Sequence, residues 1–295
     1  MRERRDSLPA TAVAKARREG LQALVTDAPK WAVTTAATSA ELAARRQLRQ
    51  LQYRRQGFRA IPDPTATIEI DPTTVTHLVP FSRFEETDPR ALLGTIREGD
   101  WDQELPRIEA QPKYEACRAR VEDDVSWEET GIVDHLADRL ESANSIEHGC
   151  SSRAELRERY ETEREALYRS LSRDGYDRTV SPVCCRMHVG RTGDFLFGEG
   201  GRHRFYLSRV LGIDSVPVQI LCRHQQWQAV RERVAEAESP EALPDEIQQF
   251  LGHPDLQALE PDGSVSGDGS EPWGPKPADQ YAGHNNANSE DRTGN

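Results

Sequence analysis

The chain has 295 residues, of which 36% are apolar and 30% are charged, and its mean hydropathy is −0.75. No apolar run approaches the roughly 20 residues that cross a bilayer as a helix, so an integral membrane protein built from helices is excluded. Five cysteines are too few for a disulfide scaffold, and no apolar stretch follows the charged start Met1–Arg5. We therefore expect a cytoplasmic protein without a cleaved secretory signal.

The net charge of −12 is distributed unevenly along the chain. Residues 1–60 carry a net charge of +8, residues 61–235 carry −9 and residues 236–295 carry −11. Only four of the 38 basic residues are lysines. An acidic, lysine-poor and arginine-rich chain fits a halophile, in which surface carboxylates hold water in strong salt. The overall acidity argues against a protein whose whole surface coats nucleic acid.

The first 60 residues predict basic helices. Apolar residues recur at helical spacing between Ala10 and Ala28, and a second helix is expected after the cap at Thr38–Ser39. The second helix carries five arginines, Arg45, Arg46, Arg49, Arg54 and Arg55. Their face has two interpretations, either a solvated surface that pairs with the acidic body or a docking face for nucleic acid or anionic lipid.

The middle of the chain predicts one strand followed by helices. Residues 65–71 alternate as a strand does, and Val75–Val79 extends the pattern. Residues 112–171 predict two or three helices, one of them capped at Ser151–Ser152 with Glu155 at the capping-box spacing. We expect residues 81–171 to form a helical insertion that builds a separate lobe over the site described below.

The third region is the most patterned part of the chain. Two strands joined by a tight turn, a Gly-rich turn, a helix, a third strand and a last helix are expected in that order, at 180–189, 194–197, 202–211, 216–222 and 225–237. Residues 238–295 predict an acidic tail, disordered from about Pro254 onward because its few apolar residues cannot offset the entropy lost on ordering.

The segment Phe195–Phe205 carries the strongest functional signal. A helix start leaves backbone N–H groups without internal acceptors, and glycines allow a ligand to approach the backbone closely. Such a strand, Gly-rich turn and helix predict a phosphate site. We predict that its phosphate-binding residues are Gly198, Gly200, Gly201, Arg202, His203 and Arg204. Glu199 is the candidate general base or Mg²⁺ ligand. The alternative is an ordinary tight turn with surface ion pairs.

This arrangement resembles the ParB/sulfiredoxin superfamily. Ile68–Val75 is similar to its opening strand motif I-x-I-D-P-x-x-I, and Leu211–Val218 is similar to the segment that ends in Val-Pro-Val. Gly198–Glu199 followed by Arg202 and Arg204 is similar to the box that holds a nucleoside triphosphate in ParB proteins. Gly200–Arg204 is similar to a sulfiredoxin motif and to a segment of related free-serine kinases. The sulfiredoxin cysteine is replaced by Arg202, so thiol chemistry is not implied.

Other candidate residues favour structural roles. Cys184 and Cys185 are adjacent on a predicted strand and face opposite ways, so they suit packing better than shared metal binding. The carboxylates of Asp100–Asp102 and of Glu128–Glu129 each flank a tryptophan and favour turns or helix starts over a Mg²⁺ site.

We therefore expect an α/β fold of the α+β kind, with a small mixed ParB/sulfiredoxin-type sheet in a core of residues 61–237. The leading functional hypothesis is binding of a nucleotide or another phosphate ligand, with Mg²⁺-assisted phosphoryl transfer or nucleotide hydrolysis. The alternative is a non-catalytic interaction module or nucleic-acid-associated scaffold with a degenerate ParB-like core, using the arginines of residues 40–60.

Overall fold

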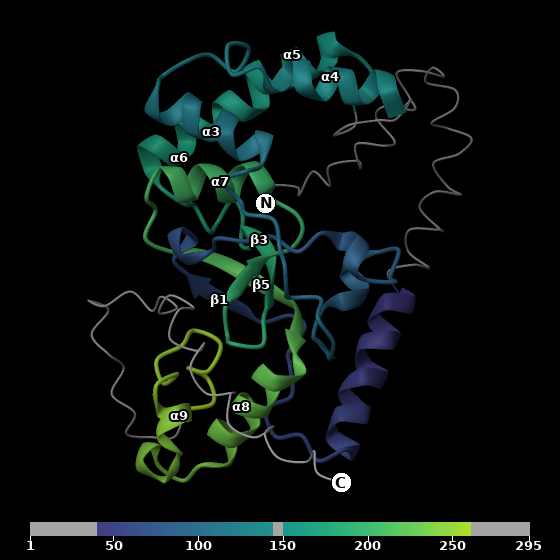
Figure 1. The fold of residues 1–295 in the computed structure, drawn as a ribbon, viewed down its shortest axis with the longest axis vertical. Helices are drawn as coiled ribbons and strands as arrows, with labels where there is room; N and C mark the ends of the chain where they lie inside the picture. The colour runs from purple at the N-terminus through teal and green to yellow at the C-terminus, as the bar shows by residue number, and fades with distance from the viewer. Residues whose placement is uncertain (1–39, 144–149, 261–295) are drawn as a thin grey trace, which may run out of the picture.

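The computed structural model describes residues 40–143 and 150–260 (Figure 1). The helix predicted between Ala10 and Ala28, and the tail from residue 261 onward, lie outside the described residues. Every helix within the described ranges is too short or too polar to cross a membrane. The described chain is a mixed α/β structure, as expected.

Five strands form one mixed sheet around a long central strand. They are β1 (Thr67–Ile70), β2 (Thr95–Arg97), β3 (Cys185–Val189), β4 (Phe195–Phe197) and β5 (Val216–His224). The order is β1-β5-β3-β4, and β2 also pairs with β5. All residues of β5 but Gln219 are buried, because strands cover both of its edges.

The strands that pair with the two edges of β5 run in different directions. β1 runs antiparallel along the first half of β5, with Ile70 opposite Val216. β2 runs parallel along the second half of the same edge. β3 runs parallel along the other edge, and β4 returns antiparallel to β3, which confirms the predicted hairpin. Residues 81–111 are therefore not a helical part of an insertion, because their three-residue strand completes the sheet.

Helices lie on two sides of the sheet (Figure 1). One group consists of α3 (Pro112–Glu122), α4 (Ile132–Ala143), α5 (Arg153–Arg159), α6 (Glu165–Asp174) and α7 (Arg202–Val210), with a π-helical turn over Tyr160–Arg164. The other consists of α8 (Gln225–Glu236), the short α9 (Asp245–Gln248) and a helix over residues 40–55. Short 3-10 turns lie at Pro72–Thr74, Phe81–Arg83, Pro89–Leu92 and Pro240–Ala242.

The helices of residues 112–174 share one core with the sheet. The main apolar cluster runs without interruption from Ile70 of β1 through Trp127 and Leu136 to Phe205 of α7. The expected separate lobe is therefore wrong, because α3 and α6 bury their apolar faces on α7. The predicted cap is confirmed, since the Ser152 hydroxyl accepts the Glu155 N–H and the Glu155 carboxylate accepts the Ser151 N–H. Cys184 and Cys185 are both buried free thiols, as predicted.

The expected disorder from Pro254 onward is wrong for residues 254–260. Leu256 is fully buried in the main core, and the side chain of Asp255 is 1% exposed. Arg223 donates to both carboxylate oxygens of Asp255, at 2.9 and 2.5 Å, and Trp227 Nε1 donates at 2.9 Å. Arg231 contacts the same carboxylate at 3.0 Å. One aspartate thus anchors a segment whose composition predicts no order.

Candidate functional site

The loop Gly198–Arg202, which joins β4 to α7, begins as an extension of the sheet. The N–H groups of Gly198 and Glu199 both donate to the carbonyl of Arg186, at 2.9 and 3.1 Å. In return, Arg186 N–H donates to the carbonyl of Glu199 at 2.9 Å. These two loop amides are therefore occupied, and the prediction that Gly198 offers its amide to a ligand is wrong.

The second half of the loop leaves the sheet through two left-handed glycines. Gly200 has φ 79°, and Gly201 has φ 59° and ψ 23°. A Cβ built on Gly201 would lie 1.8 Å from the carbonyl oxygen of Cys184, so only glycine fits there. Gly201 is the N-cap of α7, and no side chain caps this helix. A left-handed residue followed by a helix directs successive N–H groups toward one point, which favours an anion.

Of the three basic residues that open α7, one remains available. His203 is buried, and its Nε2 lies 2.8 Å from the Tyr160 hydroxyl, so it faces the neighbouring helices. Arg204 donates to the Ser181 hydroxyl and to the carbonyl of Val183, the latter at 3.0 Å. Both side chains are therefore committed to internal contacts, which removes them as free phosphate donors, against the prediction. Arg202 lies over the Phe197 ring at 5.6 Å and makes no ion pair within the described chain.

Arg186 of β3 is a site residue that sequence reasoning missed. A Cβ built on Gly200 would lie 3.2 Å from Nη1 of Arg186, so this guanidinium lies against the left-handed part of the loop. Its Nε is buried without an acceptor, and the part of the chain that the structure describes offers it no ion pair. The available signal was a single charged residue inside a strand that is otherwise mostly apolar.

Two buried polar side chains lie beside the loop. His188 is 2% exposed and stacks on Phe84, with ring centroids 5.1 Å apart. Burial lowers the pKa of His188 to about 3, so its imidazole is neutral. The Tyr206 hydroxyl is buried without a hydrogen-bond partner among the described residues. Burial raises the pKa of Tyr206 to about 12, so it stays protonated as a donor.

Glu199 is half-buried in the loop, and its carboxylate makes no hydrogen bond or ion pair with the described residues. Among those residues there is no group of three or more His, Cys, Asp or Glu side chains arranged to hold a metal. A Mg²⁺ ion that travels with a phosphate ligand needs only one or two protein carboxylates. Glu199 alone therefore fits such an ion, whereas the loop does not form a metal site by itself.

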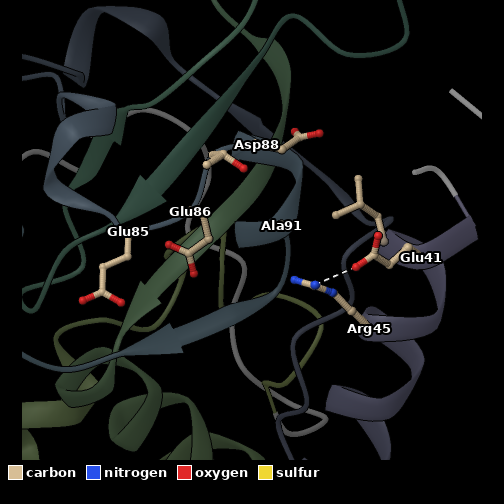
Figure 2. Close-up of a pocket in the computed structure, with 8 residues that line it drawn as sticks. Glu41, Arg45, Glu85, Glu86, Asp88 and Ala91 are labelled. Atoms are coloured by element: carbon tan, nitrogen blue, oxygen red, sulfur yellow. Dashed lines mark hydrogen bonds and ion pairs between the residues drawn. The ribbon is translucent and has the colours of Figure 1, made fainter. Parts of the chain in front are cut away.

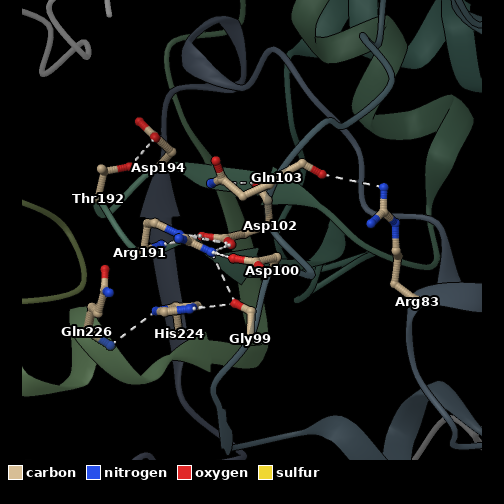
Figure 3. A network of polar contacts seen from close by, with 10 residues as sticks. All are labelled: Arg83, Gly99, Asp100, Asp102, Gln103, Arg191, Thr192, Asp194, His224 and Gln226. Carbon is tan, nitrogen blue, oxygen red and sulfur yellow. Dashed lines mark hydrogen bonds and ion pairs between the residues drawn. The ribbon is translucent and has the colours of Figure 1, made fainter. Parts of the chain in front are cut away.

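A polar clamp fixes the hairpin turn that leads into β4 (Figure 3). Arg191 donates to the buried carboxylate of Asp102 through its side chain and its N–H, and to Asp100 at 2.8 Å. Burial opposes ionisation of Asp102, but the hydrogen bonds from Arg191 outweigh it and lower the pKa. His224 accepts from Gln226 N–H at Nδ1, so its Nε2 carries the proton donated to Gly99. The carboxylates beside Trp101 thus hold the hairpin turn through Arg191.

The arginines of the helix over 40–55 do not form one free face. Arg46 and Arg49 donate to the carbonyls of Arg90, Ala91 and Leu93. Arg45 pairs with Glu41 at the rim of a cavity of about 420 Å³ (Figure 2). The other wall of that cavity contains carboxylates of Glu85, Glu86 and Asp88. Of the five arginines, only Arg54 and Arg55 are exposed without a side-chain hydrogen bond or ion pair among the described residues.

Comparison of the chain with models of protein families, with curated proteins and with solved structures found no match. The chemistry of the site therefore has to be argued from its geometry. Two arginines without carboxylate partners flank a left-handed glycine pair at an uncapped helix start. That arrangement can neutralise and orient an anion, and Glu199 supplies one carboxylate beside it.

Proposed function

We propose that the loop Gly198–Arg202 binds a phosphate-bearing ligand, and specifically a nucleotide. The observation that carries the proposal is the pair Arg186 and Arg202. Most other described arginines contact a carboxylate or a carbonyl, whereas these two flank the left-handed glycines without either. A planar guanidinium recognises phosphate through parallel N–H bonds, and a preformed pair avoids much of the cost of ordering.

The resemblance to the ParB/sulfiredoxin superfamily supports a nucleotide over other anions. The glycines, Glu199 and Arg202 occupy matching positions, while Arg204 and His203 are committed to internal contacts. In this proposal Arg186 and Arg202 neutralise the phosphates, and the N–H groups at the start of α7 orient them. Glu199 holds Mg²⁺, which screens the charge of the phosphates. Phosphoryl transfer or hydrolysis is the reaction class that such a site would support.

Calorimetric titration tests the proposal directly. ATP, CTP and GTP would each be titrated with Mg²⁺ in high salt into the wild type, Arg186→Ala and Arg202→Ala. A charge-assisted hydrogen bond contributes about 1.5–3 kcal/mol, so each variant should bind at least about tenfold more weakly. Arg233→Ala is the matched control, because Arg233 is exposed on α8 and its side chain makes no hydrogen bond or ion pair with the described residues. Equal affinity in all four proteins would contradict the proposal.

Glu199→Gln separates binding from chemistry. The amide has nearly the shape of the carboxylate but lacks its charge. We expect this variant to bind nucleotide without Mg²⁺ as well as the wild type does, and to lose the gain that Mg²⁺ gives. Release of inorganic phosphate by the wild type, abolished in Glu199→Gln, would show hydrolysis.

The alternative is a non-catalytic scaffold. The observation that favours it is the internal commitment of His203 and Arg204, which removes two of the predicted phosphate donors. Absence of nucleotide binding by the wild type would support this alternative.

A further inference from the structure

The helix over 40–55 exposes an apolar and basic face. Leu48 is 60% exposed and Leu51 is 49% exposed, although large apolar side chains of the described chain are otherwise almost all covered. Arg54 and Arg55 follow on the next turn, are exposed, and make no side-chain hydrogen bond or ion pair with the described residues. We call these four residues the Leu48–Arg55 face. Full burial of a leucine contributes about 1.5–3 kcal/mol, so a partner would gain by covering it.

Charge restricts what can cover this face. The helix over 40–55 carries five arginines and one glutamate. A second copy of the same helix would bring like charge against it. Residues 1–39 would do the same, since they contain seven basic and four acidic residues. Residues 261–295 contain six acidic and two basic residues, together with Trp273 and Tyr281. Only the last segment combines opposite charge with large apolar side chains.

The helix over 40–55 and the end of the described structure are both joined to α8. After the helix, the N–H groups of Arg59 and Ala60 donate to Glu232 of α8, at 2.8 and 3.2 Å. The C-terminal segment is tied to α8 as well, since Arg231 contacts the Asp255 carboxylate. α8 has 12 residues and is about 18 Å long. The 13 residues from Glu260 to Trp273 span up to about 45 Å when extended, which is more than twice the length of α8.

We propose that residues 262–273 of this chain dock on the Leu48–Arg55 face. Trp273 covers Leu48 and Leu51, and the carboxylates of Asp268 and Glu271 pair with Arg54 and Arg55. The segment then blocks the one basic surface of this helix that is open to a nucleic acid. The proposal is independent of the nucleotide site.

Hydrogen–deuterium exchange of the full-length protein tests this docking. The variants are Trp273→Ala and the double change Asp268→Asn with Glu271→Gln. The matched control is Glu290→Gln with Asp291→Asn, which removes the same charge further along the chain. We expect amides of residues 47–55 to exchange about tenfold faster in both test variants in dilute protein and low salt. Exchange in α7 and in the control variant should match the wild type.

Three results would overturn the proposal. Unchanged exchange in both test variants would show that this segment does not cover the face. Protection that increases with protein concentration would assign the face to a second copy of the chain. Protection by duplex DNA to the same extent in the wild type and in Trp273→Ala would assign it to nucleic acid. Stronger DNA protection of Trp273→Ala than of the wild type would support the proposed block.

Discussion

Two pairs of arginines in this molecule differ in whether a carboxylate inside the protein balances their charge. In the first, Arg223 and Arg231 surround Asp255 inside the protein, and Trp227 donates to the same carboxylate. In the second, Arg186 and Arg202 flank the loop Gly198–Arg202 without any carboxylate among the described residues. Both arginines of the first cluster are buried, whereas both of the second are half-buried.

The difference shows where each cluster finds its counter-charge. A buried guanidinium needs an internal carboxylate, because its transfer from water is otherwise too costly. Burial and the charge of Arg223 lower the pKa of Arg231 to about 10, so it stays protonated at neutral pH. A half-exposed arginine can instead rely on water or on a bound anion. The first cluster therefore has its counter-charge inside the protein, and the second has no carboxylate partner among the described residues.

The largest expected effect comes from the internal cluster. Asp255→Asn leaves Arg223 and Arg231 without a counter-charge, and we expect the free energy of unfolding to fall by about 3–5 kcal/mol. Urea unfolding measures it. Asp245→Asn is the control, since Asp245 is exposed on α9 and should change the stability by less than about 0.5 kcal/mol. Equal stability of the two variants would contradict the anchoring role of Asp255.

The next effect distinguishes the two left-handed glycines of the loop. Gly201→Ala places a Cβ on the Cys184 carbonyl, so we expect a loss of about 2–5 kcal/mol from backbone strain and overpacking. Gly200→Ala meets only the guanidinium end of the Arg186 side chain and should cost about 1–2 kcal/mol. Thermal unfolding compares the two. A smaller loss for Gly201→Ala than for Gly200→Ala would show that the described loop geometry is wrong.

The free energy of unfolding measured as a function of pH compares the two regions, because each region contains a buried histidine. Burial lowers the pKa of His188 to about 3 and that of His253 to about 4, whereas the ordinary value is about 6.5. The unfolded chain therefore binds more protons between these values, and stability falls as pH falls through this window. Between pH 7 and 4.5 each histidine should remove about 2–3 kcal/mol from the free energy of unfolding.

In His188→Gln the free energy of unfolding should depend less steeply on pH, because the contribution of one of the two histidines is removed. Exposed His135→Gln is the control, which should leave the slope of the wild type unchanged. The window stays above pH 4.5 because Asp255, whose pKa is lowered by Arg223 and Arg231 against the effect of burial, contributes only at lower pH. An unchanged slope in His188→Gln would show that this imidazole is not buried as described.

The smallest effect is expected from the site arginines. Arg202→Ala removes a half-exposed charge and one contact with the Phe197 ring, so the stability should change by no more than about 1 kcal/mol. Arg223→Ala, in the internal cluster, should cost several times more. Urea unfolding of both variants measures the contrast. A large loss for Arg202→Ala would make Arg202 a structural residue and weaken the proposed anion role.

Much of the sheet was predictable from local patterns. Alternation in 65–71, the tight turn at Gly190–Gly193 and the glycines before Arg202 identified β1, the hairpin and the start of α7. The strand β2 was not predictable, because a strand of three residues between loops is too short to show an alternation of apolar and polar residues. The roles of His203 and Arg204 could not be separated from that of Arg202, since adjacent residues on a helix face different neighbours and only packing decides which one reaches solvent.

The amino-acid sequence by itself determined the class of fold, the tight turn of the hairpin and the position of the glycine-rich loop before α7. These depend on contacts between near neighbours and on the backbone freedom of glycine. Only the tertiary structure decided that Arg186 joins the loop, that two of the loop amides are occupied and that Asp255 orders the segment after Pro254. Each of these depends on residues far apart along the chain, whose pairing follows from shared burial and not from any local pattern.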